Sequence, residues 1–321
     1  MNPLTLLLHV WLVLATPPAL NQVETILAVD TSEAINTQVL DTLRDQLQDR
    51  LDRSDFQPAT VEISDVSGQL VVTATVDAED EQAMAAYRNL FTSTTLGLWN
   101  TYHIHDAEIV QWMQGLGPID GFDFNPVELS DTKLFGQPVA LQRNGGREVH
   151  TAALGVCTQE ADQQRILDHL RTTTDGLPDL QLRWSPLTVD RYTGEAYYRL
   201  FMIKTDGRED APLTEAHLTR VEAYQERWTN EPSISLQFNE AGTAIWADMT
   251  QTAAQNDRRS IAIVINGVAY SAPRVMTAIT SGEMVIAGDF TLEEAADLAR
   301  KLDLGRLAYP LTVVSERILN D

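Results

Sequence analysis

The chain has 321 residues, of which 44% are hydrophobic and 21% are charged. This composition is typical of a folded globular protein and excludes a disordered one, and the length suggests two domains. The formal net charge is -23, so phosphate backbones and anionic lipid surfaces are repelled over most of the molecule. We therefore expect no nucleic-acid partner.

The first predicted element is an apolar segment from Leu4 to Ala15. It has the length of a signal-peptide core and is short for a membrane span. Small residues at Ala15 and Ala19 offer cleavage positions, although no Lys or Arg precedes the apolar run. We assign residues 1–22 to a signal peptide or an N-terminal anchor, with an incorrect start site as the remaining alternative. This assignment predicts a protein of the periplasm or cell envelope with no further membrane span.

Residues 23–114 are predicted to form one α+β domain. The first helix is expected to begin at a capping box of Asp30 and Glu33 and to continue to Leu51, because apolar residues recur at four-residue spacing. A second helix is expected from Asp80 to Phe91. The expected strands are 23–30, 60–64, 69–76 and 95–102. This β-α-β-β-α-β order places two helices on one face of an antiparallel sheet.

The middle of the chain is less regular. Residues 115–138 are rich in Gly, Pro and Asp and are predicted to be a linker or long loop. The one cysteine, Cys157, ends an apolar run and is interpreted as a buried structural thiol, so no disulfide within the chain and no cysteine metal site is expected. Further elements are a turn at 144–146, strands at 149–157, 180–184 and 195–204, and helices at 159–172 and 213–224.

The C-terminal third repeats the architecture of the first domain. Asn266-Gly267 predicts a hairpin between two strands, and Thr291 with Glu294 predicts a helix start. The expected strands are 234–238, 260–265, 268–272, 283–287 and 311–314, and the expected helices are 240–255 and 291–302. The predicted fold class is α+β, with two lobes of antiparallel sheet, helices on one face of each, and β-α-β-β-α-β (ferredoxin-like) units.

Few residues indicate chemistry. His103 and His105 would lie on the same side of a strand, beside Asp106, as zinc ligands require. No third histidine is nearby, so we interpret the three as solvated turn residues and predict no metal site. No hydrolase or phosphate-binding motif occurs, and we predict neither catalytic nor cofactor-binding residues. The aromatic cluster in the middle region is interpreted as core, with a patch for extended peptides as the alternative; its members are Trp184, Tyr192, Tyr197 and Tyr198.

The C-terminal third resembles one family, the SecD subunit of the bacterial protein-export machinery. The resemblance is with the head of its first periplasmic domain and covers residues 231–317, with a weaker match over 24–102. The motifs that carry it are Ser235-Leu236-Gln237-Phe238, Glu240-Ala241-Gly242, Ser271-Ala272-Pro273, Ile286 to Ala295, Leu307 to Leu311 and Glu316-Arg317, and in the weaker part Ala28 to Ala34.

This resemblance implies a base-like domain at 23–114 and a head-like domain at 139–317, with its diagnostic part at 231–317. The sequence departs from the family in three places. No Asp-x-x-Gly-Gly motif precedes the first strand, Asp303 to Arg306 replaces an Arg-Ala-Gly-Ala stretch, and the chain ends at Asp321, where the family continues into membrane helices that carry proton coupling.

What the resemblance implies is a non-enzymatic domain that captures polypeptide emerging from the translocon. For this chain we expect a detached SecD-like domain, exported alone, that binds polypeptide or docks on a Sec-type membrane complex. Peptide would add to an exposed sheet edge, the mode that demands least of the peptide sequence. The alternatives are a structural or interaction module of the envelope without a role in translocation, and an enzyme for metal-assisted hydrolysis around His103 and His105.

Overall fold

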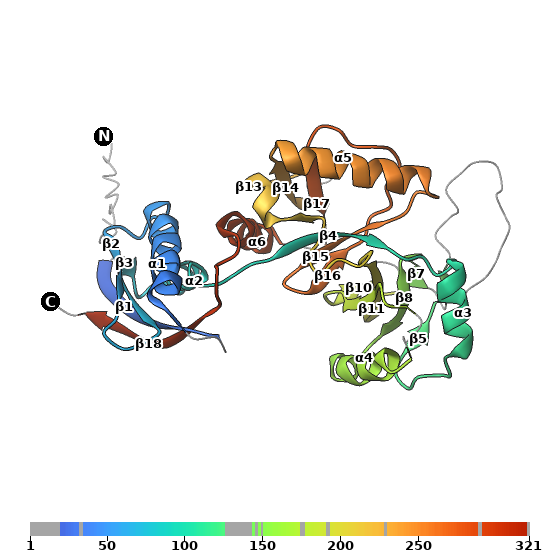
Figure 1. Cartoon of the computed structure of the whole chain (residues 1–321), viewed down its shortest axis with the longest axis horizontal. Coiled ribbons are helices and arrows are strands. Elements are labelled where there is room, and N and C mark those ends of the chain that lie inside the picture. The colour runs from blue at the N-terminus through green and yellow to red at the C-terminus, as the bar shows by residue number, and fades with distance from the viewer. Residues whose placement is uncertain are drawn as a thin grey trace, which may run out of the picture. The chain divides into compact units, whose positions relative to one another are not determined.

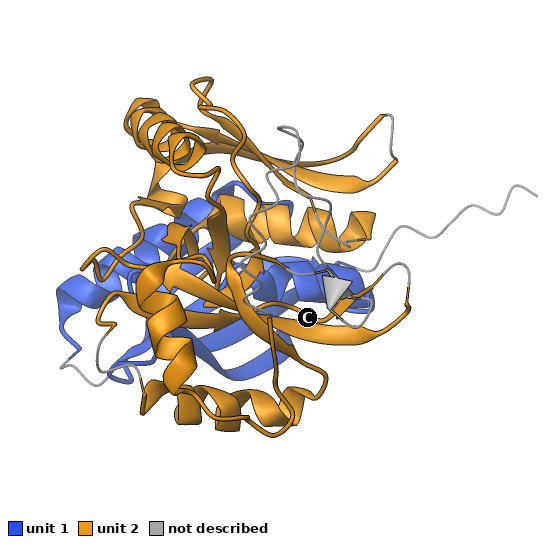
Figure 2. Ribbon diagram, turned by 90° about the vertical axis from the view of Figure 1, so that its right-hand side faces the viewer, with its two compact units in different colours: residues 1–92, 307–321 blue, residues 93–306 orange. Residues whose placement is uncertain are grey.

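The computed structural model describes residues 20–31, 35–125, 143–144, 147–148, 150–173, 177–190, 193–227, 230–287 and 291–319. It divides into two compact units (Figure 2). Unit 1 combines residues 1–92 with residues 307–321, and unit 2 comprises residues 93–306. All strand pairs among the described residues are antiparallel, so the predicted α+β fold class is confirmed.

Unit 1 is a single sheet whose strands follow the order β18-β1-β3-β2. This is the predicted β-α-β-β-α-β unit, but its last strand is β18 rather than the predicted strand 95–102. Two helices cover one face of the sheet (Figure 1). The elements are β1 (Leu20–Val29), α1 (Thr37–Asp52), β2 (Ala59–Ile63), β3 (Gln69–Asp77), α2 (Glu81–Asn89) and β18 (Leu311–Leu319).

Local sequence explains these elements. Alternate side chains of β1 are buried and face the helices, as a half-buried strand requires. Leu43, Leu47 and Leu51 form the predicted stripe of α1 and are fully buried. The helix begins later than predicted, because Asn36 caps it by accepting a 3.0 Å hydrogen bond from the Val39 N–H. Glu33 lies outside the described residues.

The predicted boundaries of the N-terminal segment and of the first domain also differ from the structure. Of the predicted N-terminal segment 1–22, residues 1–19 lie outside the described residues, while Leu20, Asn21 and Gln22 already pair with β3. The predicted boundary at residue 114 is replaced by the passage from Thr92 to Ser93, and residues 307–317 leave the predicted second domain. The boundaries move because β1 pairs with β18, a strand near the other end of the chain. Such a pairing leaves no trace in the local periodicity of the sequence.

One buried arginine holds the place where the chain leaves unit 1. Arg50 on α1 is only 3% exposed. Its guanidinium donates to the backbone oxygens of Leu90, at 2.6 Å, and Thr92, at 2.7 Å. Burial lowers the pKa of Arg50 to about 10, which leaves it charged at neutral pH. Arg50 therefore fixes the end of α2 and the exit segment against α1.

Unit 2 contains a nine-stranded sheet with the main order β16-β15-β4-β11-β8-β5, while β9 and β10 pair with β11 and β12 pairs with β4. Its elements are β4 (Leu96–Thr101), α3 (Ala107–Gly115), β5 (Asp123–Phe124), β8 (Ala153–Cys157), α4 (Gln163–Arg171), β9 (Leu180–Trp184), β10 (Thr188–Val189), β11 (Ala196–Lys204), β12 (Leu213–Thr214), β15 (Ile261–Ile265) and β16 (Val268–Ser271).

The predicted linker 115–138 is not a simple connection. Gly115 ends α3, and Asp123 and Phe124 form β5, which pairs with β8. Residues 126–138 lie outside the described residues. The short strands β6 (Arg143–Asn144) and β7 (Arg147–Glu148) pair with each other, and the predicted turn residues Gly145 and Gly146 between them lie outside the described residues.

A separate three-stranded sheet, in the order β13-β14-β17, lies beside two helices in unit 2 (Figure 1). The strands are β13 (Leu218–Gln225), β14 (Pro232–Phe238) and β17 (Glu283–Ala287), and the helices are α5 (Glu240–Gln255) and α6 (Leu292–Leu304). The helix predicted at 213–224 is wrong. This segment forms β12, a short 3-10 turn (Glu215–His217) and β13, because pairing with β4 and β14 overrides its local helix propensity.

The C-terminal third therefore does not close into a second β-α-β-β-α-β sheet. The predicted hairpin at Asn266-Gly267 is confirmed, with φ values of 50° and 80°. However, β15 of this hairpin pairs with β4, not with the sheet of β14, and the strand expected at 311–314 is part of β18 in unit 1. One apolar core joins β4, β14, α5, β15 and α6, and a second lies around β8, β9, β11, α3 and α4.

Replacing Arg50 with Leu is expected to lower the free energy of unfolding by about 2–4 kcal/mol, because two buried carbonyl groups lose their donor. Urea denaturation of the full chain measures this loss. The matched control is Arg53→Leu at the C-terminal cap of the same helix, because the ion pair of Arg53 with Asp49 is exposed and contributes about 0.5 kcal/mol. Equal losses for the two variants would show that Arg50 does not hold the exit segment.

Candidate functional site

An apolar pocket opens in unit 2 between α5, β15 and β17. Its volume is about 490 Å³, a size typical of sites for small ligands or peptide side chains. Most of its wall comes from one helix, two strands and the segment that connects β16 to β17. The lining residues are Trp246, Ile261, Ile263, Pro273, Arg274, Val275, Met276, Thr277, Ile279, Ser281, Glu283, Met284 and Val285.

Hydrogen bonds to α5 and one glycine position the wall that precedes β17. The fully buried Thr250 accepts a 2.9 Å bond from the Ile279 N–H, which ties the connecting segment to α5. Gly282 has a φ of 70° and lies so close to Thr243 that a Cβ would collide with it. Gly282 also accepts a 2.9 Å bond from the Phe238 N–H. Only glycine fits this point, where the chain turns into β17.

Strand β17 is the outer strand of its sheet and borders the pocket. Among the described residues, no strand pairs with its outer side. Met284 and Ile286 are buried, whereas Val285 is 49% exposed, and both Met284 and Val285 line the pocket. An unpaired edge leaves backbone donors and acceptors available to another extended chain. The pocket and the edge together therefore form one surface that we call the β17 groove, comprising the lining residues and β17.

Two flexible side chains shape the β17 groove. Met276 is half exposed at the pocket wall and Met284 is buried beneath it. Methionine is unbranched and polarizable, and it adapts to differently shaped apolar partners. The charged residues of the lining, Arg274 and Glu283, are of opposite sign and both exposed. The groove is thus apolar, adaptable and close to neutral.

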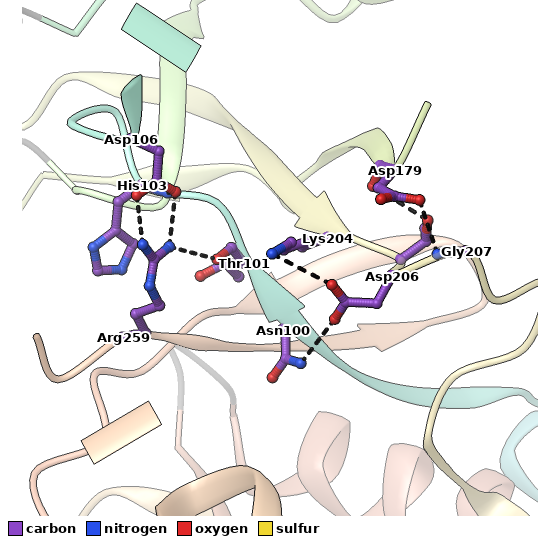
Figure 3. A network of polar contacts seen from close by, with 10 residues as sticks. Asn100, Thr101, His103, Asp106, Asp179, Lys204, Asp206, Gly207 and Arg259 are labelled. Carbon is purple, nitrogen blue, oxygen red and sulfur yellow. Dashed lines mark hydrogen bonds and ion pairs between the residues drawn. The ribbon is translucent and has the colours of Figure 1, made fainter. Parts of the chain in front are cut away.

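A polar network lies at the end of β4 (Figure 3). The Asp106 carboxylate accepts two bonds from the Arg259 guanidinium, at 2.7 Å and 2.5 Å, and one of 2.9 Å from the His103 N–H. The His103 Nε2 atom accepts a 3.3 Å bond from the Ser260 N–H, which assigns the ring proton to Nδ1. The interpretation of His103 and Asp106 as solvated turn residues is therefore wrong.

The two histidines of the predicted cluster are not brought together as ligands. β4 ends at Thr101, so the period of two does not continue through this segment. His103 is buried and only 5% exposed, whereas His105 is exposed. In the part of the chain that the structure describes, no group of three His, Cys, Asp or Glu residues is arranged to hold a metal ion.

The titration of the network follows from its burial. Burial, with Arg259 as a second cause, lowers the pKa of His103 to about 4. Burial disfavours the charged form of Asp106, but the bonds from Arg259 and from the His103 N–H more than offset it and lower the pKa of the carboxyl. At neutral pH, the imidazole is neutral and the carboxylate and guanidinium form an ion pair. The carboxylate, the two terminal guanidinium nitrogens and the imidazole are each hydrogen-bonded within the fold, which is typical of a structural role.

The same network extends along β4 to β11 (Figure 3). Asp206 accepts a 3.2 Å bond from Asn100 and pairs with Lys204 at 3.4 Å. The Gly207 N–H donates to Asp179 at 2.8 Å. A smaller cavity of about 270 Å³ lies here, and its lining includes Asp106, Glu108, Lys204, Asp206 and Arg259. These contacts fasten β4, β11 and the start of β15 together.

The other candidate residues from the sequence belong to the core where the structure describes them. Trp184 and Tyr197 are buried, in agreement with their interpretation as core, and Tyr198 packs against the second core. Tyr192 lies outside the described residues. Cys157 is buried as predicted, and burial raises the pKa of its thiol to about 11, which keeps it protonated and unreactive.

Sequence reasoning missed the β17 groove. Its residues come from four segments between Trp246 and Ala287, and neither motif nor spacing connects them. Two sequence features pointed to it only indirectly. Ser271-Ala272-Pro273 ends β16 where the pocket wall begins, and Gly282 marks the point where the backbone passes close to Thr243.

In the described residues, no helix is long and apolar enough to cross a membrane.

Comparisons with known proteins show what this architecture is similar to. Residues 202–309, which include the whole β17 groove, match the family model of the SecDF P1 head subdomain. The SecD subunit of the protein translocase of Calditerrivibrio nitroreducens is 36% identical over 132 residues, covering 41% of this chain and 24% of that protein. The SecD of Rickettsia typhi is 34% identical over 105 residues, covering 33% and 20%. The chain thus spans about a quarter or less of the curated relatives it matches.

Two solved structures have the same fold. A crystal structure of SecDF in a super-membrane-facing form has a TM-score of 0.54 at 18% identity, covering 94% of this chain and 30% of that one. A structure of SecDF, described as a membrane component that enhances protein export, has a TM-score of 0.51 at 19% identity, covering 92% and 100%. These comparisons confirm the resemblance to the SecD family and to its P1 domain that the sequence predicts.

The buried His103 is expected to make stability depend on pH. Its pKa is about 4 in the folded chain and about 6.5 when unfolded. The unfolded state therefore takes up the proton first, so this contribution is complete above about pH 6.5 and is lost as the pH falls towards 4. Between pH 7 and pH 5, His103→Gln should lose about 2 kcal/mol less unfolding free energy than the wild type, because glutamine accepts the Ser260 bond without titrating.

The control for this prediction is His105→Gln, which changes an exposed histidine two residues away. Urea denaturation at pH 7 and pH 5 gives the loss for each variant. His105→Gln should follow the wild type. If His103→Gln also loses as much as the wild type, the imidazole is not held in the neutral form by burial.

Proposed function

We propose that this chain binds extended polypeptide in the course of protein export, with the β17 groove as the binding surface. The observation that carries the proposal is the joint presence of an apolar pocket and an unpaired strand edge within residues 202–309, the region similar to the SecDF P1 head. An extended chain laid along β17 would form main-chain hydrogen bonds with the edge. Its alternate side chains would enter the pocket.

The chemistry of the groove fits a partner of variable sequence. Backbone pairing at an edge does not depend on the side chains of the partner. The two methionines let the pocket adapt to apolar side chains of different shapes. The net charge of -23 on the whole chain favours encounter with basic segments. Together these properties support capture of many polypeptides rather than one.

The compartment and the partner belong to the same proposal. We infer a place in the periplasm or cell envelope and a Sec-type membrane complex as the partner, from the similarity to SecD and SecDF. We also propose that the chain is non-catalytic. In support of this, the buried ionisable groups at the end of β4 are engaged with one another, in an ion pair and a neutral imidazole.

Val285→Glu is expected to weaken the binding of an extended, neutral apolar peptide at least tenfold, because the charge enters the apolar groove beside the edge. Fluorescence anisotropy of the labelled peptide measures the affinity at neutral pH. Val314→Glu is the matched control, since Val314 lies on β18 of unit 1 and is similarly exposed, at 54%. It should bind like the wild type.

Two results would contradict the proposed function. One is the absence of peptide binding by the wild type at high micromolar concentration. The other is an equal loss for Val285→Glu and Val314→Glu, which would remove the groove as the site. Pull-down of the Sec complex from an envelope fraction tests the partner, and recovery of other envelope proteins alone would favour a structural or interaction module.

A further inference from the structure

One buried donor in the β17 groove has no acceptor. Trp246 lies on α5, is 4% exposed and lines the pocket. Its indole ring packs at a tilt against Phe238, with 6.1 Å between the ring centroids. The indole Nε1–H makes no hydrogen bond among the described residues. A buried donor without a partner costs about 1–3 kcal/mol, and an indole N–H can only donate.

We propose that the Trp246 indole N–H is the polar anchor of the groove and donates to a main-chain carbonyl oxygen of the bound polypeptide. This inference rests on the proposed function and names the group by which the pocket recognises its ligand. Apolar pockets usually carry a few polar groups that fix the orientation of a ligand. Here Trp246 lines the same pocket as residues of the edge strand β17, so one extended chain can use both.

Because the indole N–H of Trp246 lacks an acceptor, a ligand that supplies one is favoured over a ligand that does not. A hydrocarbon chain would fill the pocket but leave the donor unsatisfied, and it would gain nothing from the free edge of β17. A polypeptide carries a carbonyl at every residue, so any sequence can supply the acceptor. The anchor therefore adds affinity for polypeptide over lipid without adding dependence on sequence.

Occupation requires a small movement of the pocket wall. The indole nitrogen has almost no surface accessible to solvent. Met276 and Met284 line the same pocket, and their unbranched side chains can change rotamer at low cost. We expect these methionines to shift when a peptide enters, so that a carbonyl reaches the indole N–H.

The other buried atoms without partners are weaker candidates. They are the Thr151 and Ser260 hydroxyls and the Nε atoms of Arg199 and Arg259. Of these residues, Ser260 and Arg259 line the smaller cavity. Arg259 is already engaged with Asp106 and Thr101, and a hydroxyl can rotate towards water or a neighbour. Among the buried atoms without partners in the described residues, only the Trp246 Nε1 atom belongs to a side chain that can solely donate and that lines an apolar pocket large enough to admit a peptide side chain.

The experiment compares Trp246→Phe with the wild type, because phenylalanine keeps an aromatic ring and removes the donor. An acetylated and amidated apolar nonapeptide is the first probe and should bind the variant about tenfold more weakly. Benzene, which fills apolar cavities but has no carbonyl, is the second probe and should bind as well or better. In the full-length wild type, the Trp246 indole proton resonance, assigned by its loss in the variant, should move downfield with the peptide.

The outcomes separate this inference from the proposed function. If the wild type binds no peptide, both the proposed function and the role of Trp246 as its anchor are refuted. If the wild type binds, but Trp246→Phe binds equally well and the indole resonance does not move downfield, the groove is retained and the anchor is refuted. If the variant does not fold, the indole resonance of the wild type, assigned through the contact of its ring with Phe238, decides alone.

Discussion

The pairing of β4 with β15 is the constraint on which the candidate site depends. The two strands pair over five residues, from Leu96 with Ile265 to Asn100 with Ile261. Asn266 extends the pair, because it exchanges two hydrogen bonds of 2.9 Å and 3.0 Å with Thr95. Since β15 and its hairpin are engaged by β4, they cannot complete the sheet of β14. That sheet stops at β17, which leaves both the unpaired edge and the pocket between the two sheets.

Sequence patterns predicted the elements better than their partners. The stripe of α1, the Asn266-Gly267 hairpin and the capping box of α6 were all recognisable, because each depends on residues a few positions apart. The pairing of β1 with β18 joins Glu24 to Arg317, and no local signal reports such a distance. β13 was mistaken for a helix for the same reason, since its strand state depends on β14.

The candidate site was the least predictable part. His103 and Asp106 looked like turn residues, and only the fold shows that Arg259 and Ser260, far along the chain, bury and pair with them. The β17 groove is assembled from short pieces that bear no motif. An indole N–H without an acceptor is a property of three-dimensional packing, so no reading of the sequence could have singled out Trp246 from the other tryptophans.

The discontinuity of unit 1 has a consequence for biogenesis. A chain that emerges from its N-terminus presents β1, α1, β2, β3 and α2 long before β18, because the whole of unit 2 is synthesised in between. Until the last segment arrives, β1 has one bare side, and closing it requires contacts of very large sequence separation, which form slowly. Unit 2 is one continuous segment of the chain, so it can fold before β18 is synthesised. The order of folding therefore runs against the order of synthesis, and the early unit depends on the late strand for completion.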